Sequence, residues 1–414
     1  MKKGLAIALF VICGTVYGQN NNYKQYLSEN KEAINLTGKN NWNLLKQDAE
    51  HAQLIVLGES HGAQNTQFID FNLLSYLNKT FGLKNYVAEL DYAQSSLINE
   101  YLATGDEQKL KTVFRFLVKE HSQWGNYDFY NKVIKIRNLN KTLSNDEKIK
   151  YTGIDVVQDY NGYLKFIHHF IENKKGSLLD SLKIETALKP EDTVDIEKTT
   201  SFAVRYLQVI EQNKSEFQNV FKQQFGTLQY LIQNLSYGNR NSGINRPEGI
   251  YRNFKQLYEV LHWENQKLYG MWGFFHAHLI PFYYVGGDFI SKLANSNHPI
   301  ANKIVSIICL PIDSKYNVWD RTNNAWTKQK FSYDDKSLLE IEGIQDLKDL
   351  TEESSTTLFK LNGINSPFPK TGRLVNGIAP QGKLVGDFKN QDYANQYIIL
   401  VRNSDWLHPL PQNF

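Results

Sequence analysis

The chain has 414 residues, of which 41% are hydrophobic and 13% aromatic. This composition can bury a large core and excludes an intrinsically disordered protein. The formal net charge is +3 and becomes +1 without Lys2 and Lys3, so the chain lacks the basic character of a nucleic-acid-binding protein. Beyond the first segment only Cys309 remains as a cysteine, which excludes a disulfide framework.

The first segment reads MKKGLAIALFVICGTVYGQNNN. Two lysines, an apolar core of about a dozen residues and a polar end are typical of a secretory signal peptide. The core is shorter than the roughly 20 residues of a membrane-spanning helix. The residues before Cys13 also lack the small side chains expected ahead of a lipidated cysteine. We therefore predict a signal peptide over residues 1–18, a mature chain over 19–414 without a membrane span, and a secreted or periplasmic protein.

Six short apolar runs are each typical of a strand that is buried on both faces. They are AQLIVLG (52–58), KNYVAEL (84–90), KIKYTGID (148–155), LYGMWGFF (268–275), KIVSIICL (303–310) and QYIILVR (396–402). Between the first two, residues 66–82 show an apolar helical face that ends at Gly82, which makes a strand–helix–strand unit. The sequence therefore predicts an α/β fold with a mostly parallel central sheet flanked by helices.

From about residue 160 to 240 apolar residues recur at helical spacings, which predicts a helical insertion. Two interpretations of the insertion stand equal: it forms a lid or second lobe, or its helices pad the sheet. Further along, residues 313–330 are polar and aromatic, and we expect them to run over the surface.

Polar side chains gather where the predicted strands end. In LGESHGAQ (57–64) Glu59 and His61 lie two residues apart, so in extended chain both face the same side. A carboxylate beside an imidazole fixes its tautomer and raises its basicity, as a general base requires. In isolation this string is a weak signal, and a satisfied turn is the better explanation. Its position at the carboxyl edge of a parallel sheet, where ligands bind, favours a functional site.

The next two strand ends carry acids. Glu89 ends the run 84–90, and because an unpaired buried carboxylate is costly, we expect it to meet a cation or imidazole or to act as a general acid. We predict Glu89 as a catalytic residue and Asp91 and Asp155 as substrate-binding residues. For Asp91 the simpler interpretation is an N-cap of the next helix.

The fourth strand end, MWGFFHAHLIP, has His276 and His278 two residues apart. Such a pair suits zinc or another divalent metal, and it serves equally as a pair of acid–base and hydrogen-bonding groups. A satisfied core histidine is the simpler alternative for each. The chain has no GXSXG, HEXXH, CXXC or Walker motif, which disfavours a serine or cysteine nucleophile and leaves water.

These motifs together resemble the erythromycin esterase-like proteins, part of a wider group with the ChaN-like haem-uptake and Tiki-type proteins. The matching elements are GESHG, AELD, GID, RPEGIYRN (246–253) and HAH, in the family's order over roughly residues 50–290. The single residue between Glu59 and His61 is closer to the ChaN-like branch. The resemblance implies His61 as the general base on water and Glu89 as its partner or acid. It implies Arg246, His276 and His278 as oxyanion or substrate-positioning groups.

Arg246 is followed by Pro247, which suits the first turn of a helix. We expect Arg246 to precede that helix and to pair with Glu89 or Asp155. The alternative is a solvated surface arginine.

We therefore predict a hydrolase that cleaves an ester or lactone-like bond of a small-molecule substrate without a cofactor, with Glu59 orienting His61. The first alternative is a metal-dependent hydrolase with zinc or a similar ion on Glu59, His61, His276 and His278. The second is an envelope protein that binds haem or another ligand, as the ChaN-like branch suggests. Met271 is the one methionine of the mature chain, so axial ligands of a haem would otherwise be histidine or tyrosine.

Overall fold

The computed structural model describes residues 22–189, 192–282, 287–335, 340–374, 377–379, 382–383 and 386–414. The predicted signal peptide lies outside these residues. The chain divides into two compact units: the first comprises residues 1–76 and 273–408, and the second comprises 77–272 and 409–414. No helix in the described part of the chain is long and apolar enough to cross a membrane.

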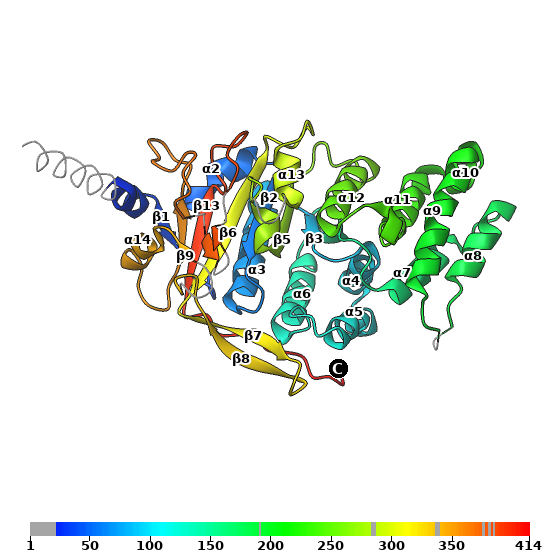
Figure 1. Ribbon diagram of the computed structural model, residues 1–414, viewed down its shortest axis with the longest axis horizontal. Coiled ribbons are helices and arrows are strands. Elements are labelled where there is room, and N and C mark those ends of the chain that lie inside the picture. The colour runs from blue at the N-terminus through cyan, green and yellow to red at the C-terminus, as the bar shows by residue number, and fades with distance from the viewer. Residues whose placement is uncertain are drawn as a thin grey trace, which may run out of the picture. The chain divides into compact units, whose positions relative to one another are not determined.

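The sheet of the first unit is mostly parallel in its buried centre (Figure 1). Its strand order is β1 (Lys31–Ala33), β10 (Thr356–Lys360), β13 (Tyr397–Arg402), β6 (Ile304–Ile312) and β2 (Leu54–Glu59). The last three run parallel, whereas β1 and β10 are antiparallel additions. Every residue of β2, β6 and β13 is buried, as expected for central parallel strands. Three of the six predicted strands are therefore confirmed here.

The remaining elements of the first unit lie around this sheet. They are α2 (Asn43–His51), α3 (Asn65–Phe81, which continues into the second unit), the short 3₁₀ helix η4 (Phe274–Ala277), α13 (Phe289–Ala294), α14 (Ile344–Asp349) and a small antiparallel sheet of β9 (Glu340–Ile341), β11 (Gly377–Ala379) and β12 (Gly382–Lys383). The segment expected at the surface forms a hairpin of β7 (Ser314–Asp320) and β8 (Ala325–Phe331). Its β8 side chains are exposed or half-buried, which agrees with that expectation.

The second unit contains the other three predicted strands, which run parallel in the order β5 (Leu268–Gly273), β3 (Asn85–Ala88) and β4 (Lys150–Gly153). Gly153 ends β4 where the chain that leaves β3 passes directly over it. A Cβ atom on Gly153 would lie 2.2 Å from the carbonyl oxygen of Asp91, so only glycine fits there. This close crossing brings the polar loops after β3 and β4 together. The predicted α/β fold class is confirmed.

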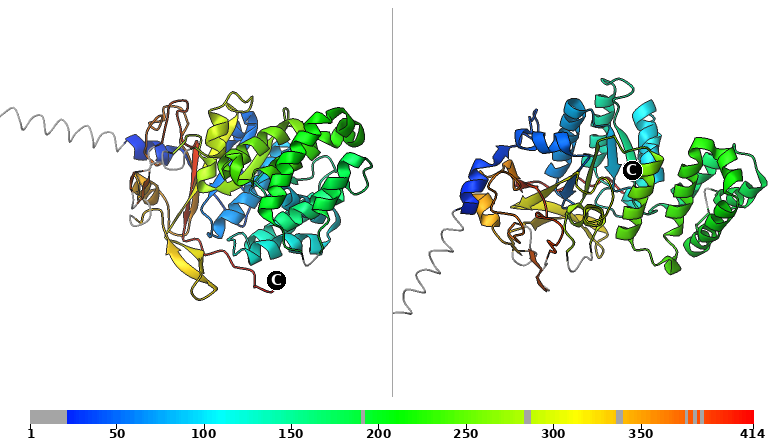
Figure 2. Two further views of the ribbon diagram at one scale, coloured as in Figure 1. Left: turned by 45° about the vertical axis from the view of Figure 1, so that its right-hand side comes forward. Right: turned by 90° about the horizontal axis from the view of Figure 1, so that it is seen from above.

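Helices make up most of the second unit. Near its strands lie α4 (Tyr92–Thr104), α5 (Glu107–Lys119) and α6 (Tyr127–Asn140). Further helices follow as α7 (Tyr160–Ile171), α8 (Asp180–Thr186), α9 (Ile196–Gln212), α10 (Lys214–Phe221), α11 (Phe225–Ser236) and α12 (Arg246–Val260). Helices α9 and α11 lie side by side in Figures 1 and 2. The lid or second-lobe role of residues 160–240 stays a prediction.

Candidate functional site

Glu59 and His61 form a hydrogen-bonded pair at the end of β2. His61 Nδ1 donates to Glu59 Oε1 at 2.9 Å, and the Thr66 hydroxyl donates to Glu59 Oε2 at 2.8 Å. The carboxylate is only 1% exposed, whereas the imidazole is 35% exposed. Because Nδ1 carries the shared proton, the basic lone pair of the neutral ring lies on Nε2.

Two glycines shape the backbone around this pair. A Cβ atom on Gly58 would lie 2.5 Å from Ile308 Cδ1 and 2.9 Å from Ala277 Cβ, so glycine lets β2 pack closely here. Gly62 has a φ of 103°, which other residues rarely adopt. The strand stops at Glu59, and His61 already lies in a turn. We expected a continuous strand to place Glu59 and His61 on the same side. In the structure the hydrogen bond between their side chains holds them together instead.

His276 and His278 do not lie at the end of an extended strand, contrary to the prediction. Strand β5 stops at Gly273, and residues Phe274–Ala277 form the 3₁₀ helix η4. Its three residues per turn replace the two-residue alternation of a strand. The two imidazoles consequently have separate partners. His276 Nδ1 donates to Asp288 Oδ1 at 2.6 Å, and Asp288 is also the N-cap of α13.

His278 packs against aromatic rings. Its ring centroid is 4.7 Å from that of Phe274 and 4.6 Å from that of Phe282, and only 1% of the residue is exposed. Its Nδ1 lies 3.0 Å from Asn395 Oδ1. Burial lowers the pKa of His278 to about 4, because a low-dielectric environment disfavours the charged ring. At neutral pH this imidazole is uncharged. Its burial agrees with the core-histidine alternative, and its predicted catalytic role stays a prediction.

The rings of His61 and His276 meet beside Gly273. A Cβ atom on Gly273 would lie 3.0 Å from His61 Nε2 and 3.4 Å from His276 Cδ2. We call Glu59, His61, His276 and Asp288 the histidine cluster. It consists of two imidazoles, each held through Nδ1 by a buried carboxylate. Such an arrangement can take up a proton at one ring and deliver a proton from the other.

Arg246 is the centre of a separate group in the second unit. Its Nε donates to Asp155 Oδ1 at 3.0 Å, and its Nη2 donates to Asp155 Oδ2 at 2.7 Å and to Glu89 Oε1 at 2.6 Å. Partial burial lowers the pKa of Arg246, but the attraction and hydrogen bonds of the two carboxylates outweigh it and raise the pKa overall. Arg246 pairs with both acids, as expected, although 41% of its side chain remains exposed to solvent, and its role in the reaction stays a prediction. We call Arg246, Asp155 and Glu89 the arginine cluster.

Local sequence explains how Arg246 reaches these acids. It is the first residue of α12 and not the residue before it, and the N-cap Asn245 accepts a hydrogen bond from the Glu248 backbone at 3.0 Å. Near the other end of RPEGIYRN, Asn253 donates to the carbonyl oxygens of Ile154 and Asp155 at 3.0 and 3.2 Å. One turn of the motif therefore supplies the guanidinium, and another holds the loop that carries its partner.

Asp155 and Asp91 are both fully buried in the structure, with 0% of either residue exposed. Asp91 caps α4 by accepting from Gln94 N at 2.9 Å, as the simpler interpretation predicted. It also accepts from the backbone of Gln158 and Asp159, each at 3.2 Å. Burial nevertheless raises its pKa to about 7. Neither aspartate has exposed surface in this structure, and their predicted role in substrate binding stays a prediction.

The four side chains considered as zinc ligands are engaged in other ways. Both Glu59 oxygens accept hydrogen bonds, His276 Nδ1 faces Asp288, and His278 is enclosed by aromatic rings. Among the described residues no group of three or more His, Cys, Asp and Glu side chains is arranged to hold a metal ion. The residues present do not fit the tetrahedral site that zinc requires.

The sequence did not indicate three residues that position the site side chains. Thr66, Asp288 and Asn395 hold Glu59, His276 and His278 respectively. A capping signal was available for Asp288, since Ser291 three residues later completes a capping box. Nothing local connects it with His276, and Asn395 lies 117 residues from His278.

No protein-family model matches the chain, and no curated protein matches it. Several solved structures share its fold. A protein from Bacillus cereus is 16% identical, with a TM-score of 0.72, and the alignment covers 95% of this chain and 99% of that one. A succinoglycan biosynthesis protein is 15% identical with a TM-score of 0.65 over 94% and 99% of the two chains.

The third similar structure is a histidine-to-asparagine variant of the erythromycin esterase EreC in its open conformation. It is 12% identical, with a TM-score of 0.64 over 90% of this chain and 98% of that one. At such identities the likeness shows the fold alone. The chain has the fold of erythromycin esterase, as its motifs predicted.

Proposed function

We propose that the protein is a hydrolase that cleaves an ester or lactone-like bond of a small molecule with water activated by His61. The observation that carries the proposal is the hydrogen bond from His61 Nδ1 to the buried carboxylate of Glu59. This pairing fixes the tautomer that a general base needs and stabilises the imidazolium that forms when it takes a proton. The shared fold with an erythromycin esterase supports this reaction class.

In the proposed reaction His61 Nε2 removes a proton from water as the water oxygen forms a bond to the substrate carbonyl carbon. The resulting tetrahedral intermediate collapses when the bond to the alcohol oxygen breaks. His276 supplies a proton to that oxygen, because Asp288 stabilises the charged form of its ring. The proton gained by His61 then passes to His276, directly or through exchange with solvent, so that both rings return to their starting protonation states. Ester and water enter, and acid and alcohol leave, with no other reactant consumed.

The test is hydrolysis of a panel of aryl esters, simple lactones and erythromycin by the purified protein, followed by mass spectrometry as the addition of one water. We expect turnover of at least one member. His61→Asn should abolish it while the melting temperature stays near that of the native protein. His169→Asn is the matched control, because that imidazole is 79% exposed on α7, and it should keep full activity.

Two results contradict the proposal. Full activity of His61→Asn on an identified substrate removes His61 as the base. Absence of hydrolysis across the panel by the folded native protein removes this substrate class. The predicted role of Arg246 in binding an oxyanion or substrate is tested on the same substrate with Arg246→Lys, which keeps the charge but loses the bidentate fork. An unchanged kcat/KM would show that Arg246 has no part in the transition state.

We also infer that the enzyme acts in the periplasm or outside the cell. The lysines and the apolar core of residues 1–18 support this localisation. Expression of the full chain followed by N-terminal sequencing of the mature product tests it. Cleavage near residue 18 is expected, and an intact N-terminus on all of the product would contradict it.

A further inference from the structure

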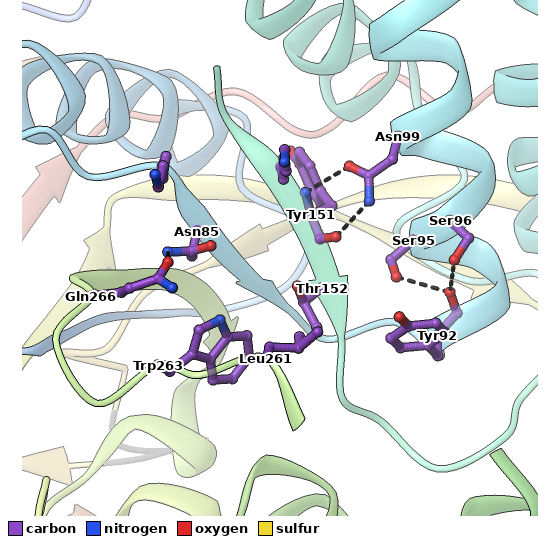
Figure 3. Close-up of a pocket in the computed structure, with 12 residues that line it drawn as sticks. Asn85, Tyr92, Ser95, Ser96, Asn99, Tyr151, Thr152, Leu261, Trp263 and Gln266 are labelled. Carbon is purple, nitrogen blue, oxygen red and sulfur yellow. Dashed lines mark hydrogen bonds between the residues drawn. The ribbon is translucent and has the colours of Figure 1, made fainter. Parts of the chain in front are cut away.

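A cavity of about 360 Å³ lies within the second unit, and Figure 3 shows residues that line it. Its wall comes from one face of α4, from the start of β3, from the first three residues of β4, and from the connection between α12 and β5. None of Arg246, Asp155 and Glu89 lines it. The cavity nevertheless comes near the arginine cluster along the chain, because its lining residues Tyr92 and Thr152 lie three residues from Glu89 and Asp155 respectively.

Hydroxyl groups line the α4 side of the cavity. The hydroxyls of Ser95 and Ser96 both donate to the carbonyl oxygen of Tyr92, each at 2.9 Å. A hydroxyl has one donor and two acceptor lone pairs, so each serine oxygen retains the capacity to accept a hydrogen bond. This side of the wall is therefore set up to receive donors from a ligand, as the hydroxyl groups of a sugar would be.

Fixed amides surround the same space. Asn85 Nδ2 donates to Gln266 Oε1 at 2.8 Å, and the Asn99 amide is hydrogen-bonded to both backbone groups of Tyr151, at 2.7 and 2.8 Å. Figure 3 shows these amides on opposite sides of the paired strands β3 and β4. Because the hydrogen bonds hold the side chains in one orientation, a ligand would lose little free energy in ordering them.

Charge and apolar surface complete the wall. Lys84 and Lys150 lie next to each other at the start of β3 and β4, and no acidic residue lines the cavity. Leu261 and Trp263 lie beside Thr152, with the Tyr92 ring across from them (Figure 3). An aromatic and aliphatic surface between hydrogen-bonding groups suits the apolar face of a sugar ring.

We propose that this cavity is a second ligand site, which binds a monosaccharide carrying a phosphate or carboxylate group. The two lysines attract the anionic group, and the serine oxygens accept hydrogen bonds from ring hydroxyls. The volume is at the lower end of the roughly 300–1,000 Å³ found for small-molecule pockets, which limits the ligand to about one ring. This site is independent of the proposed hydrolysis at His61.

Isothermal titration of the native protein with four probes tests the site: glucose 6-phosphate, glucuronate, glucose and inorganic phosphate. Saturable binding of glucose 6-phosphate or glucuronate is expected, and which of the two binds more tightly identifies the anionic group. Glucose and inorganic phosphate should each bind at least about tenfold more weakly, a difference of about 1.4 kcal/mol. Equal binding of inorganic phosphate would overturn the sugar part of the proposal, and no saturable binding of either anionic sugar would overturn all of it.

Two variants of the cavity wall and one control variant connect the binding with this cavity. Lys150→Glu reverses a charge at an exposed position and should weaken binding at least about tenfold. Lys39→Glu makes the same change at an exposed lysine of the first unit and should leave binding unchanged. Ser96→Phe, which fills the cavity from α4, should abolish binding without loss of the native circular dichroism spectrum. Equal binding by all three variants would place the ligand elsewhere.

His61→Asn separates this proposal from the proposed function. Because the cavity contains no member of the histidine cluster, the variant should bind the anionic sugar as tightly as the native protein while hydrolysis is lost. Loss of sugar binding in this variant would contradict an independent site.

Discussion

The histidine cluster and the arginine cluster are built from the same kind of acid but hold different cations. In the first unit each buried carboxylate faces an imidazole, which gains and loses a proton near neutral pH. In the second unit two carboxylates face one guanidinium, which keeps its charge at any physiological pH. The histidine cluster can therefore move protons, whereas the arginine cluster supplies fixed charge and fixed geometry.

This difference predicts whether a substitution in each cluster changes mainly the activity or mainly the stability of the protein. Removing an imidazole of the histidine cluster should mainly change activity, because the two imidazoles carry the proposed proton transfers. Removing the arginine should mainly change stability, because Asp155 has 0% exposure and Glu89 is buried, and both would lose their counter-charge.

Arg246→Met is the variant with the largest expected effect on folding. We expect it to lower the free energy of unfolding by about 3–4 kcal/mol, near the lower end for a broken buried ion pair, because 41% of the arginine side chain is exposed and water can partly replace it. Arg252→Met is the control on the same helix, since its partner Glu248 makes an exposed i,i+4 pair worth about 0.3–0.5 kcal/mol. Urea denaturation of both variants measures the difference. Equal losses would show that the arginine cluster contributes no more than a surface pair.

His278 provides the next effect, which appears as a dependence of stability on pH. Its pKa is about 4 in the folded protein and about 6.5 in an unfolded chain, so the unfolded state binds the extra proton between these values. Stability contributed by the neutral ring is complete above about pH 6.5 and is lost as the pH falls toward 4, by at most about 3 kcal/mol.

Denaturation of the native protein and of His278→Gln at about pH 7 and pH 4 isolates this contribution. The native protein should lose more stability on acidification than the variant does. His51→Gln, at an exposed position on α2, should keep the native dependence. Parallel curves for the native protein and His278→Gln would show that His278 titrates normally.

Asp288→Asn tests whether the second imidazole of the histidine cluster takes part in the chemistry. The amide would no longer stabilise a charged His276, so we expect kcat to fall about 10–100-fold, or about 1.4–2.7 kcal/mol, and the pH–rate profile to shift. Asp320→Asn in the β7–β8 turn is the control and should change neither. A lower kcat with an unshifted profile would assign Asp288 a structural role only.

Asp91→Ala should have the smallest effect. Loss of an N-cap costs about 0.5–2 kcal/mol, and the upper part of that range applies because Asp91 also accepts from two further backbone groups. Asp106→Ala, which removes the exposed N-cap of α5, should cost less. Thermal unfolding compares them. A larger cost for Asp106 would show that the crossing of the loops after β3 and β4 does not depend on Asp91.

The sequence was sufficient for the strands and for the pairing of Arg246. Continuous apolar runs mark buried strands locally, and acids at their carboxyl ends required a cation that RPEGIYRN could supply. The positions of Asp91 and Asp155 were predicted, but their complete burial was not, because it depends on the passage of Asp91 over Gly153.

The histidine pair shows why local patterns are not sufficient. The prediction that His276 and His278 face the same side required β5 to continue to His278. In the structure the chain instead forms η4 directly after Gly273. The partners of the two imidazoles come from later segments of the chain. Asp288, 12 residues after His276, supplies a carboxylate, and Asn395, 117 residues after His278, supplies an amide. Contacts at that separation leave no signature in a single sequence.

The two hydrogen bonds between Asn99 and the backbone of Tyr151 have a further consequence for how molecules of this protein behave at high concentration. Strand β4 is the last in the order β5, β3, β4, and a strand in that position can recruit a strand from another molecule and start aggregation. The Asn99 amide already occupies the N–H and C=O groups of Tyr151, as a single residue of a neighbouring strand would. Intermolecular pairing at this point must therefore displace an intramolecular partner, which protects the protein without a charged residue at that position.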